Sequence, residues 1–155
     1  MLARSGPIPA RGQWAFEVEW DGFRALVRTE GEFQVRSRRG WDMTELVPEL
    51  AEMPARGVFD GELVTFDGEG RSDFPAVCHR ILNGDASLAL TFVVFDVLAL
   101  DGQVTMALPH AERRRLLDSL GLCDERWHVS PAFDDPFALW DVCSSASTRA
   151  SWRSG

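Results

Sequence analysis

Hydrophobic and polar residues alternate over the first part of the chain, which is the pattern of half-buried strands. Over residues 14–20 the large apolar side chains fall on one side, and Glu17 and Glu19 fall together on the other. Strand patterning resumes over residues 23–28 and 33–37, after turns at residues 21–22 and 29–32. Asp21 and Gly22 between two such stretches are a strong hairpin signal, because glycine adopts positive φ without steric cost. The pattern predicts a β-meander of antiparallel strands that pair with their neighbours in sequence.

The rest of the chain mixes strands with short helices. Further strands are expected at residues 57–66, 88–100 and 127–130. Helical segments are expected at residues 48–53, 74–81, 109–120 and 137–142. The helix over 109–120 carries Arg113, Arg114 and Arg115 in a row, which we interpret as a solvated face in preference to a nucleic-acid contact. Residues 1–13 predict an irregular lead-in, and residues 143–155, dominated by Ser and Arg, predict a disordered tail.

Charge restricts the kinds of partner. The 155 residues carry 24 acidic and 16 basic side chains, for a formal net charge of −8. All the basic residues are arginines, and no lysine occurs anywhere in the chain. This balance opposes non-specific attraction to nucleic acid, although local arginine clusters remain able to contact phosphates.

Cysteine usage and hydropathy indicate a compartment. Three cysteines at unrelated spacings predict neither a disulfide framework nor a metal site, and they indicate a reducing cytoplasm. The longest apolar run, residues 88–100, is too short to span a bilayer and contains Asp96. No cationic-then-apolar leader opens the chain. We therefore expect a cytoplasmic location and no membrane partner.

Two segments carry side chains suited to nucleotide chemistry. Arg38, in the run S-R-R-G at residues 37–40, is either part of a solvated basic loop or a contact for phosphate or ribose, because a guanidinium fork matches phosphate oxygens in pairs. Glu62 follows Gly61 on a predicted strand. It is either a half-exposed acidic residue on a sheet edge or a contact for a ribose hydroxyl or Mg²⁺. Local chemistry does not separate these alternatives.

Four ordered segments resemble the motifs of the ATP-dependent DNA ligases. Residues 20–24, W-D-G-F-R, are similar to the end of motif I, K-x-D-G-x-R, with Glu19 at the position of the lysine. Residues 37–40 resemble motif Ia, residues 60–64 (D-G-E-L-V) motif III, and residues 92–98 (F-V-V-F-D-V-L) motif IIIa. The lead-in, residues 1–7, also fits. From Met1 to about Val142 the chain is identified as a member of this family, most similar to the ligases of bacterial non-homologous end joining.

The resemblance implies a fold, a reaction and a set of ligands. The family fold is α+β, with antiparallel sheets and flanking helices around an ATP cleft. The family's reaction uses ATP and Mg²⁺: the motif I lysine attacks the α-phosphate, and the lysyl-AMP passes AMP to the 5′-phosphate of nicked or broken double-stranded DNA. By position, the nucleotide-facing residues are Glu17, Arg24, Arg38, Glu62 and Phe95. Phe95 takes the place of the aromatic residue that stacks on the adenine, and Glu62 is the candidate metal ligand.

Two departures from the family pattern bear on activity. Glu19 replaces the nucleophile, and a carboxylate forms no phosphoramidate and repels the triphosphate. Motifs IV and V and the oligonucleotide-binding domain of the family have no counterpart in the sequence. We therefore expect residues 1–142 to form a C-terminally incomplete adenylation domain, with residues 143–155 as a tail.

Three hypotheses follow for function. The first is a ligase-family fragment that cannot form lysyl-AMP and has no ligation activity, which makes it a pseudoenzyme of DNA repair and recombination ancestry. The second is a non-catalytic module that binds a nucleotide or a partner. The third is an enzyme of different chemistry. Measurable ATP affinity separates the first from the second, and an ATP-dependent product separates the third.

Overall fold

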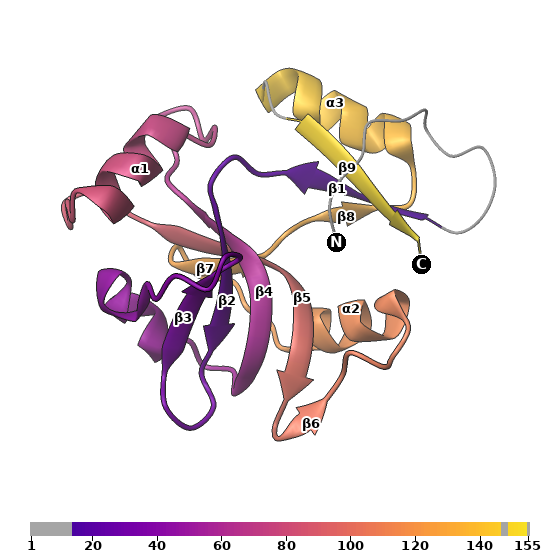
Figure 1. Cartoon of the computed structure of the whole chain (residues 1–155). Coiled ribbons are helices and arrows are strands. Elements are labelled where there is room, and N and C mark those ends of the chain that lie inside the picture. Colours follow the sequence, from indigo (N-terminus) through magenta and orange to yellow (C-terminus); the bar gives the residue numbers. More distant parts are fainter. Residues whose placement is uncertain (1–13, 147–148, 155) are drawn as a thin grey trace.

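The computed structural model describes residues 14–146 and the backbone of residues 149–154. Within these residues the strands form two sheets, seen in the lower and the upper right part of Figure 1. The larger sheet has the order β3 (Gln34–Ser37), β2 (Phe23–Arg28), β4 (Gly57–Val64), β5 (Thr91–Leu100) and β6 (Gln103–Val104), with β7 (Trp127–Val129) parallel to β5. The smaller sheet has the order β8 (Ala132–Phe133), β1 (Trp14–Glu19) and β9 (Arg149–Ser154).

Helices lie beside both sheets. Two 3-10 helices, η1 (Thr44–Leu46) and η2 (Pro48–Glu52), replace the regular helix expected near residues 48–53. The α-helices are α1 (Phe74–Leu82), α2 (His110–Ser119) and α3 (Pro136–Ala146). The expected helices over 74–81 and 109–120 are confirmed to within one residue at each end. The expected α+β class, with antiparallel sheets and flanking helices, is confirmed.

The predicted β-meander is wrong at its first step. Strand β1 does not pair with β2; it lies between β8 and β9 in the smaller sheet, while β2 pairs with β3 and β4 in the larger one. Residues 20–22 therefore connect two sheets and do not close a hairpin. Local alternation predicts strands correctly, but it does not say which strand will be the partner.

Gly22 is required for a reason other than the expected turn. Its φ is not in the left-handed region where the structure places other glycines such as Gly31 and Gly40. A Cβ atom at Gly22 would lie 2.2 Å from the carbonyl oxygen of Leu63 and 2.9 Å from a methyl group of Val64. The chain enters β2 in direct contact with the end of β4, and only glycine fits this approach.

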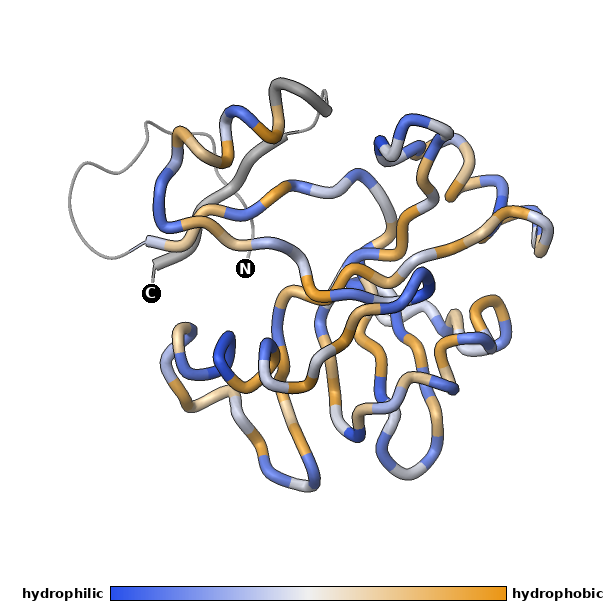
Figure 2. Tube along the Cα trace, turned by 180° about the vertical axis from the view of Figure 1, so that it is seen from behind, coloured by the Kyte–Doolittle hydropathy of each residue, from blue (hydrophilic) through white to orange (hydrophobic). Residues whose placement is uncertain are grey.

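The main core lies against the larger sheet. It takes apolar side chains from β2 to β5, from both 3-10 helices, and from α1 and α2, including Val27, Val35, Met43, Leu50, Phe59, Leu63, Ile81, Phe92, Val94, Val97 and Leu117. Strand β5 is buried from Thr91 to Val97, as its apolar sequence predicted. Figure 2 shows hydrophobic residues along these central strands and hydrophilic residues at many of the loop tips.

A second, smaller cluster lies between β1 and α3. Phe16 and Val18 pack against Leu139 and Cys143, with Trp14, Trp20 and Phe133 beside them. The predicted apolar side of residues 14–20 is thereby confirmed. Glu17, on the opposite side, is not solvated: it is 2% exposed.

Arg114 and Ser130 join the two sheets. Arg114, on α2, lies 3.6 Å from the carboxylate of Glu17 in the smaller sheet and donates to the carbonyl oxygen of Ser130 at 2.7 Å. Buried Ser130 also donates its N–H to Val94 of the larger sheet and accepts a hydrogen bond from the Trp20 indole at 3.0 Å. The solvated arginine face predicted for this helix is therefore wrong at Arg114.

Arg113 departs from the solvated-face prediction in the same way. It binds the carboxylate of Asp96 on β5 through Nε and Nη2, both at 2.8 Å. Arg113 and Arg114 therefore attach α2 to carboxylates on both sheets, and they do not form a solvent-exposed face.

The structure also differs from the prediction at the end of the chain. Helix α3 extends to Ala146, where the sequence predicted an end near Val142. Residues 149–154, part of the segment predicted to be a disordered tail, pair with β1 along its whole length, from Trp14 opposite Ser154 to Glu19 opposite Arg149. Backbone hydrogen bonding to an open strand edge does not need an apolar side-chain pattern, so composition misses it. The lead-in over residues 1–13 lies outside the described residues, and within those residues no helix is long and apolar enough to cross a membrane.

We predict that Gly22→Ala destabilises the protein by about 2–3 kcal/mol, because the new methyl group meets a backbone oxygen that cannot move aside. Gly68→Ala is the matched control, since a Cβ atom there meets nothing within 4 Å and the residue has no positive φ. Urea denaturation of the two variants and the parent chain measures the difference. Equal midpoints for the two variants would contradict the close approach of β2 and β4.

Candidate nucleotide-binding site

Phe95 is the extra residue of a β-bulge. In the pairing of β4 with β5, Gly61 lies opposite Val94 and Asp60 lies opposite Asp96, so no residue of β4 faces Phe95. Such a bulge adds one residue to one strand and redirects the side chains that follow it. Val94 and Val97 both join the main core as a result, whereas Phe95 and Asp96 point out of it.

The bulge brings Phe95 against Arg24 of β2. The guanidinium carbon of Arg24 lies 4.5 Å from the centroid of the Phe95 ring. Arg24 also binds Asp60 of β4 in a two-pronged pair, with Nε to Oδ1 at 2.8 Å and Nη2 to Oδ2 at 2.6 Å. Burial is the largest single influence on the pKa of the Arg24 guanidinium, and it acts to lower that pKa. The pair with Asp60 and the charges of Glu62 and Asp96 together outweigh burial, so the pKa is raised.

Glu62 completes the group. It lies directly opposite Arg24 in the β2–β4 register. Burial raises the pKa of the Glu62 carboxyl to about 7; Arg24 acts in the opposite direction, and the charges of Asp60, Asp21 and Glu19 add to the rise. We call Glu19, Asp21, Arg24, Asp60, Glu62 and Phe95 the Arg24 cluster.

The structure thus places four of the six sequence-predicted residues in the Arg24 cluster: Glu19, Arg24, Glu62 and Phe95. Glu17 is instead buried beside Arg114 at the joint between the sheets. Arg38 has an exposed side chain just after β3, and its backbone N–H donates to the carbonyl oxygen of Arg24 at 3.3 Å. The backbone of Arg38 therefore adjoins the cluster.

Asp60 is the functional candidate that the sequence analysis missed. It stands in the D-G-E run that singled out Glu62, yet only the structure shows that it holds the Arg24 guanidinium. The next residue, Gly61, contributes by its size, since a Cβ there would lie 2.5 Å from both the Phe92 ring and the carbonyl oxygen of Val93. The lack of a side chain at Gly61 therefore allows β4 and β5 to approach each other closely at the bulge.

The side chains of the Arg24 cluster fit a nucleoside better than a metal ion or a triphosphate. A flat aromatic ring, a guanidinium and carboxylates suit a base and ribose hydroxyls. Four carboxylates with one arginine oppose the approach of phosphates. Among residues 14–146, no group of three or more His, Cys, Asp or Glu side chains is arranged to hold a metal ion.

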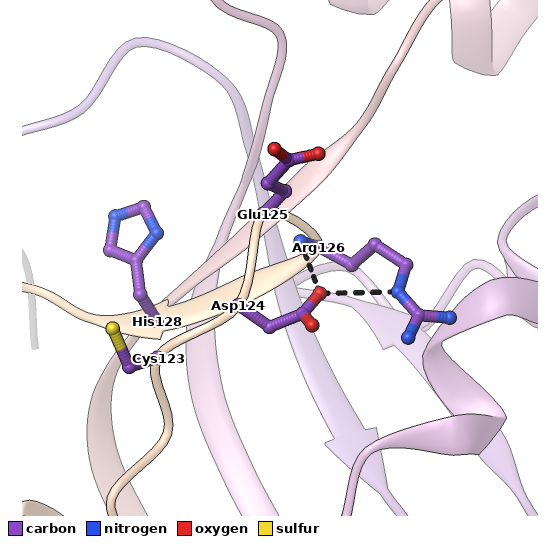
Figure 3. Close-up of a pocket in the computed structure, with 5 residues that line it drawn as sticks. All are labelled: Cys123, Asp124, Glu125, Arg126 and His128. Atoms are coloured by element: carbon purple, nitrogen blue, oxygen red, sulfur yellow. Dashed lines mark hydrogen bonds and ion pairs between the residues drawn. The ribbon is translucent and has the colours of Figure 1, made fainter.

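A separate surface hollow lies at the start of β7 (Figure 3). It is lined by Cys123, Asp124, Glu125, Arg126 and His128. Asp124 accepts hydrogen bonds from the backbone N–H of Arg126 at 3.0 Å and from its Nε at 3.2 Å. Burial lowers the pKa of the His128 imidazole, whose ring stacks on Phe66. The sequence analysis did not single out this region.

Comparisons with known proteins show the family of the chain. A family model described as "ATP dependent DNA ligase domain" matches residues 7–134. That match covers most of the chain. The chain belongs to the ATP-dependent DNA ligase domain family.

Bacterial end-joining ligases are among its relatives. The chain is 35% identical over 128 residues to the multifunctional non-homologous end joining DNA repair protein LigD of Mycobacterium tuberculosis, covering 77% of this chain and 16% of the relative. It is 37% identical over 118 residues to LigD of Pseudomonas aeruginosa, covering 72% and 14%. A solved mycobacterial DNA ligase D complexed with ATP and MES superposes with a TM-score of 0.81 at 30% identity, covering 99% of this chain and 54% of that one.

These matches confirm the nucleotidyltransferase fold of the LigD ligase domain. The chain spans about half of that solved ligase and a smaller share of the curated relatives.

We predict that Glu62 makes stability fall as pH rises from about 4.5 to about 7. Its pKa is higher in the folded than in the unfolded chain, so the folded state binds the proton more tightly and loses this advantage on ionisation. The loss is on the order of 2–3 kcal/mol. The difference in unfolding free energy between the parent chain and Glu62→Gln should change by this amount between pH 4.5 and pH 8. Glu45→Gln, at an exposed position, is the control, and a pH-independent difference for Glu62→Gln would refute the assignment.

Proposed function

We propose that this chain is part of a DNA ligase adenylation domain that does not adenylate itself. The residue at the nucleophile position is Glu19, and the chain contains no lysine that could replace it. The single observation that carries the proposal is this lack of a lysine, at position 19 and in the rest of the sequence. A carboxylate here neither forms a phosphoramidate nor attracts a triphosphate.

Non-covalent nucleotide binding is the second candidate function. Phe95 offers an aromatic ring outside the main core, Arg24 beside it is able to contact a phosphate, and Glu62 is able to contact a ribose hydroxyl. The solved mycobacterial ligase that shares this fold was complexed with ATP, which supports the same type of ligand here. Mg²⁺ is not part of this proposal, because burial raises the pKa of Glu62 to about 7 and no group of acidic, His or Cys side chains among the described residues is arranged to hold a metal ion.

Broken or nicked DNA is the proposed partner by descent, with weak binding. A net charge of −8 opposes the phosphate backbone. We propose that the adenylation-domain part is not limited to residues 1–142, because α3 continues to Ala146 and residues 149–154 pair with β1. Cys78 and Cys123 carry free thiols, and we propose a reducing cytoplasm as their compartment.

We predict that the chain forms no covalent AMP adduct. Incubation with ATP labelled on the α-phosphate and with Mg²⁺, followed by denaturing electrophoresis, should leave the protein band unlabelled. A band that retains label after denaturation would overturn the proposal.

We predict that Glu19→Lys forms the adduct slowly and seals no nicks. The substitution supplies an amine and removes one repelling charge, but three other carboxylates of the Arg24 cluster remain near the phosphates. Positioning without electrostatic stabilisation of the reacting phosphate leaves most of the barrier. Glu19→Gln, which removes the charge and adds no nucleophile, is the control. Nick sealing by the Glu19→Lys chain alone would show that this reasoning is wrong.

A further inference from the structure

The aromatic ring of the site is already covered. Phe95 is only 7% exposed, although the β-bulge turns it out of the main core. A group that lies over it is the Arg24 guanidinium, at 4.5 Å from the ring centroid. We propose that Arg24 is a built-in cover: it occupies the place of a flat ligand on Phe95, and a nucleobase stacks on that ring face only after Arg24 has moved. This inference deepens the proposed nucleotide binding and rests on it.

The physical basis is competition for one surface. A guanidinium is planar and cationic, and it stacks on aromatic faces as a base does. Two flat groups cannot occupy the same ring face at one time. A ligand that stacks there therefore replaces Arg24. Its apparent affinity equals its affinity for the uncovered ring multiplied by the fraction of molecules in which the ring is uncovered.

Asp60 holds the cover in place. Its two carboxylate oxygens take both Nε and Nη2 of Arg24, at 2.8 and 2.6 Å. The side chain of Asp60 is 16% exposed, so the pair is mostly shielded from solvent. Three strands of the larger sheet thus contribute: β5 supplies the ring, β2 supplies the cover, and β4 supplies the carboxylate that holds the cover. Asp60 is a positioning residue that acts through Arg24.

The cover discriminates between classes of ligand. A phosphate group competes with Asp60 for the guanidinium and so helps to draw Arg24 off the ring. A nucleoside without phosphate has no such group and must displace Arg24 by stacking alone. Adenosine is therefore the ligand that reports the cover most directly, and it also avoids repulsion between phosphates and the carboxylates of the Arg24 cluster.

The test is an adenosine titration, followed by calorimetry or ligand-observed NMR, of the parent chain and the double variant Arg24→Met, Asp60→Asn. Removing both charges avoids leaving Asp60 without its cation. Adenosine should bind the double variant on the order of tenfold more tightly. Adding Phe95→Leu to the double variant should abolish this gain, because the uncovered ring is then absent.

A matched control comes from the other guanidinium that lies over a ring. Arg126 lies 4.3 Å from the centroid of Trp127, outside the Arg24 cluster. Arg126→Met should leave adenosine binding unchanged; an equal gain would mean that any uncovered ring binds adenosine, and would overturn the proposal. If the double variant does not fold, Asp60→Asn alone loosens the cover and should give a gain of roughly threefold.

An ATP titration of the parent chain tests the proposed nucleotide binding separately. ATP binding without a gain of adenosine affinity in the variants overturns the cover and leaves nucleotide binding standing. A gain of adenosine affinity in the variants without ATP binding by the parent chain supports the cover and overturns the proposed ATP binding. Weaker adenosine binding by the variants would make Arg24 a ligand contact and not a cover.

Discussion

The geometry of the site depends on Phe95, a residue of the central strand β5 that has no partner in the register with β4. Strands β4 and β5 approach closely at Gly61, where even a methyl group would meet the Phe92 ring and a backbone oxygen. At this point β5 contains one residue more than β4, and the bulge turns Phe95 away from the core while Val94 and Val97 stay in it. A regular strand would instead place Phe95 and Val97 on the same face. The ring, the guanidinium of Arg24 and the carboxylates of β4 meet because of this irregularity.

The chemistry of the cluster follows from how its charges are arranged. One arginine faces four carboxylates in a partly buried setting, and burial together with the neighbouring acids brings the pKa of Glu62 to about 7. A lysine at position 19 would add a second cation and a nucleophile, whereas Glu19 adds a further acid. We therefore propose that the fold keeps the base-facing and ribose-facing parts of a ligase site and lacks the means to attack a phosphate.

Much of the fold was predictable because it is local. The period-2 pattern over residues 14–20 identified a strand and its apolar face, and the apolar run of β5 identified a buried strand. Strand pairing was not predictable: the Asp21–Gly22 turn looked like a hairpin, but tertiary packing placed β1 and β2 in different sheets. Strand β9 was missed because edge pairing uses backbone groups, on which the Ser/Arg composition gives no information.

The candidate residues came from motif order, and their arrangement came only from the structure. Arg24, Glu62 and Phe95 were named from short motifs, yet no pattern showed the bulge or the Asp60 pair that brings them together. Arg113 and Arg114 looked solvated because a run of arginines usually is, and long-range partners on β5 and β1 decided otherwise. Such contacts between residues distant in the chain have no local signal.

A crystal structure of the chain soaked with ATP and Mg²⁺ is the most direct test of the proposed nucleotide binding without self-adenylation. We expect an adenine ring stacked on Phe95, the Arg24 guanidinium displaced from that ring, and no covalent density between any side chain and the α-phosphate. Continuous density from a protein side chain to the α-phosphorus, or a bound nucleotide with Arg24 still over Phe95, would contradict it.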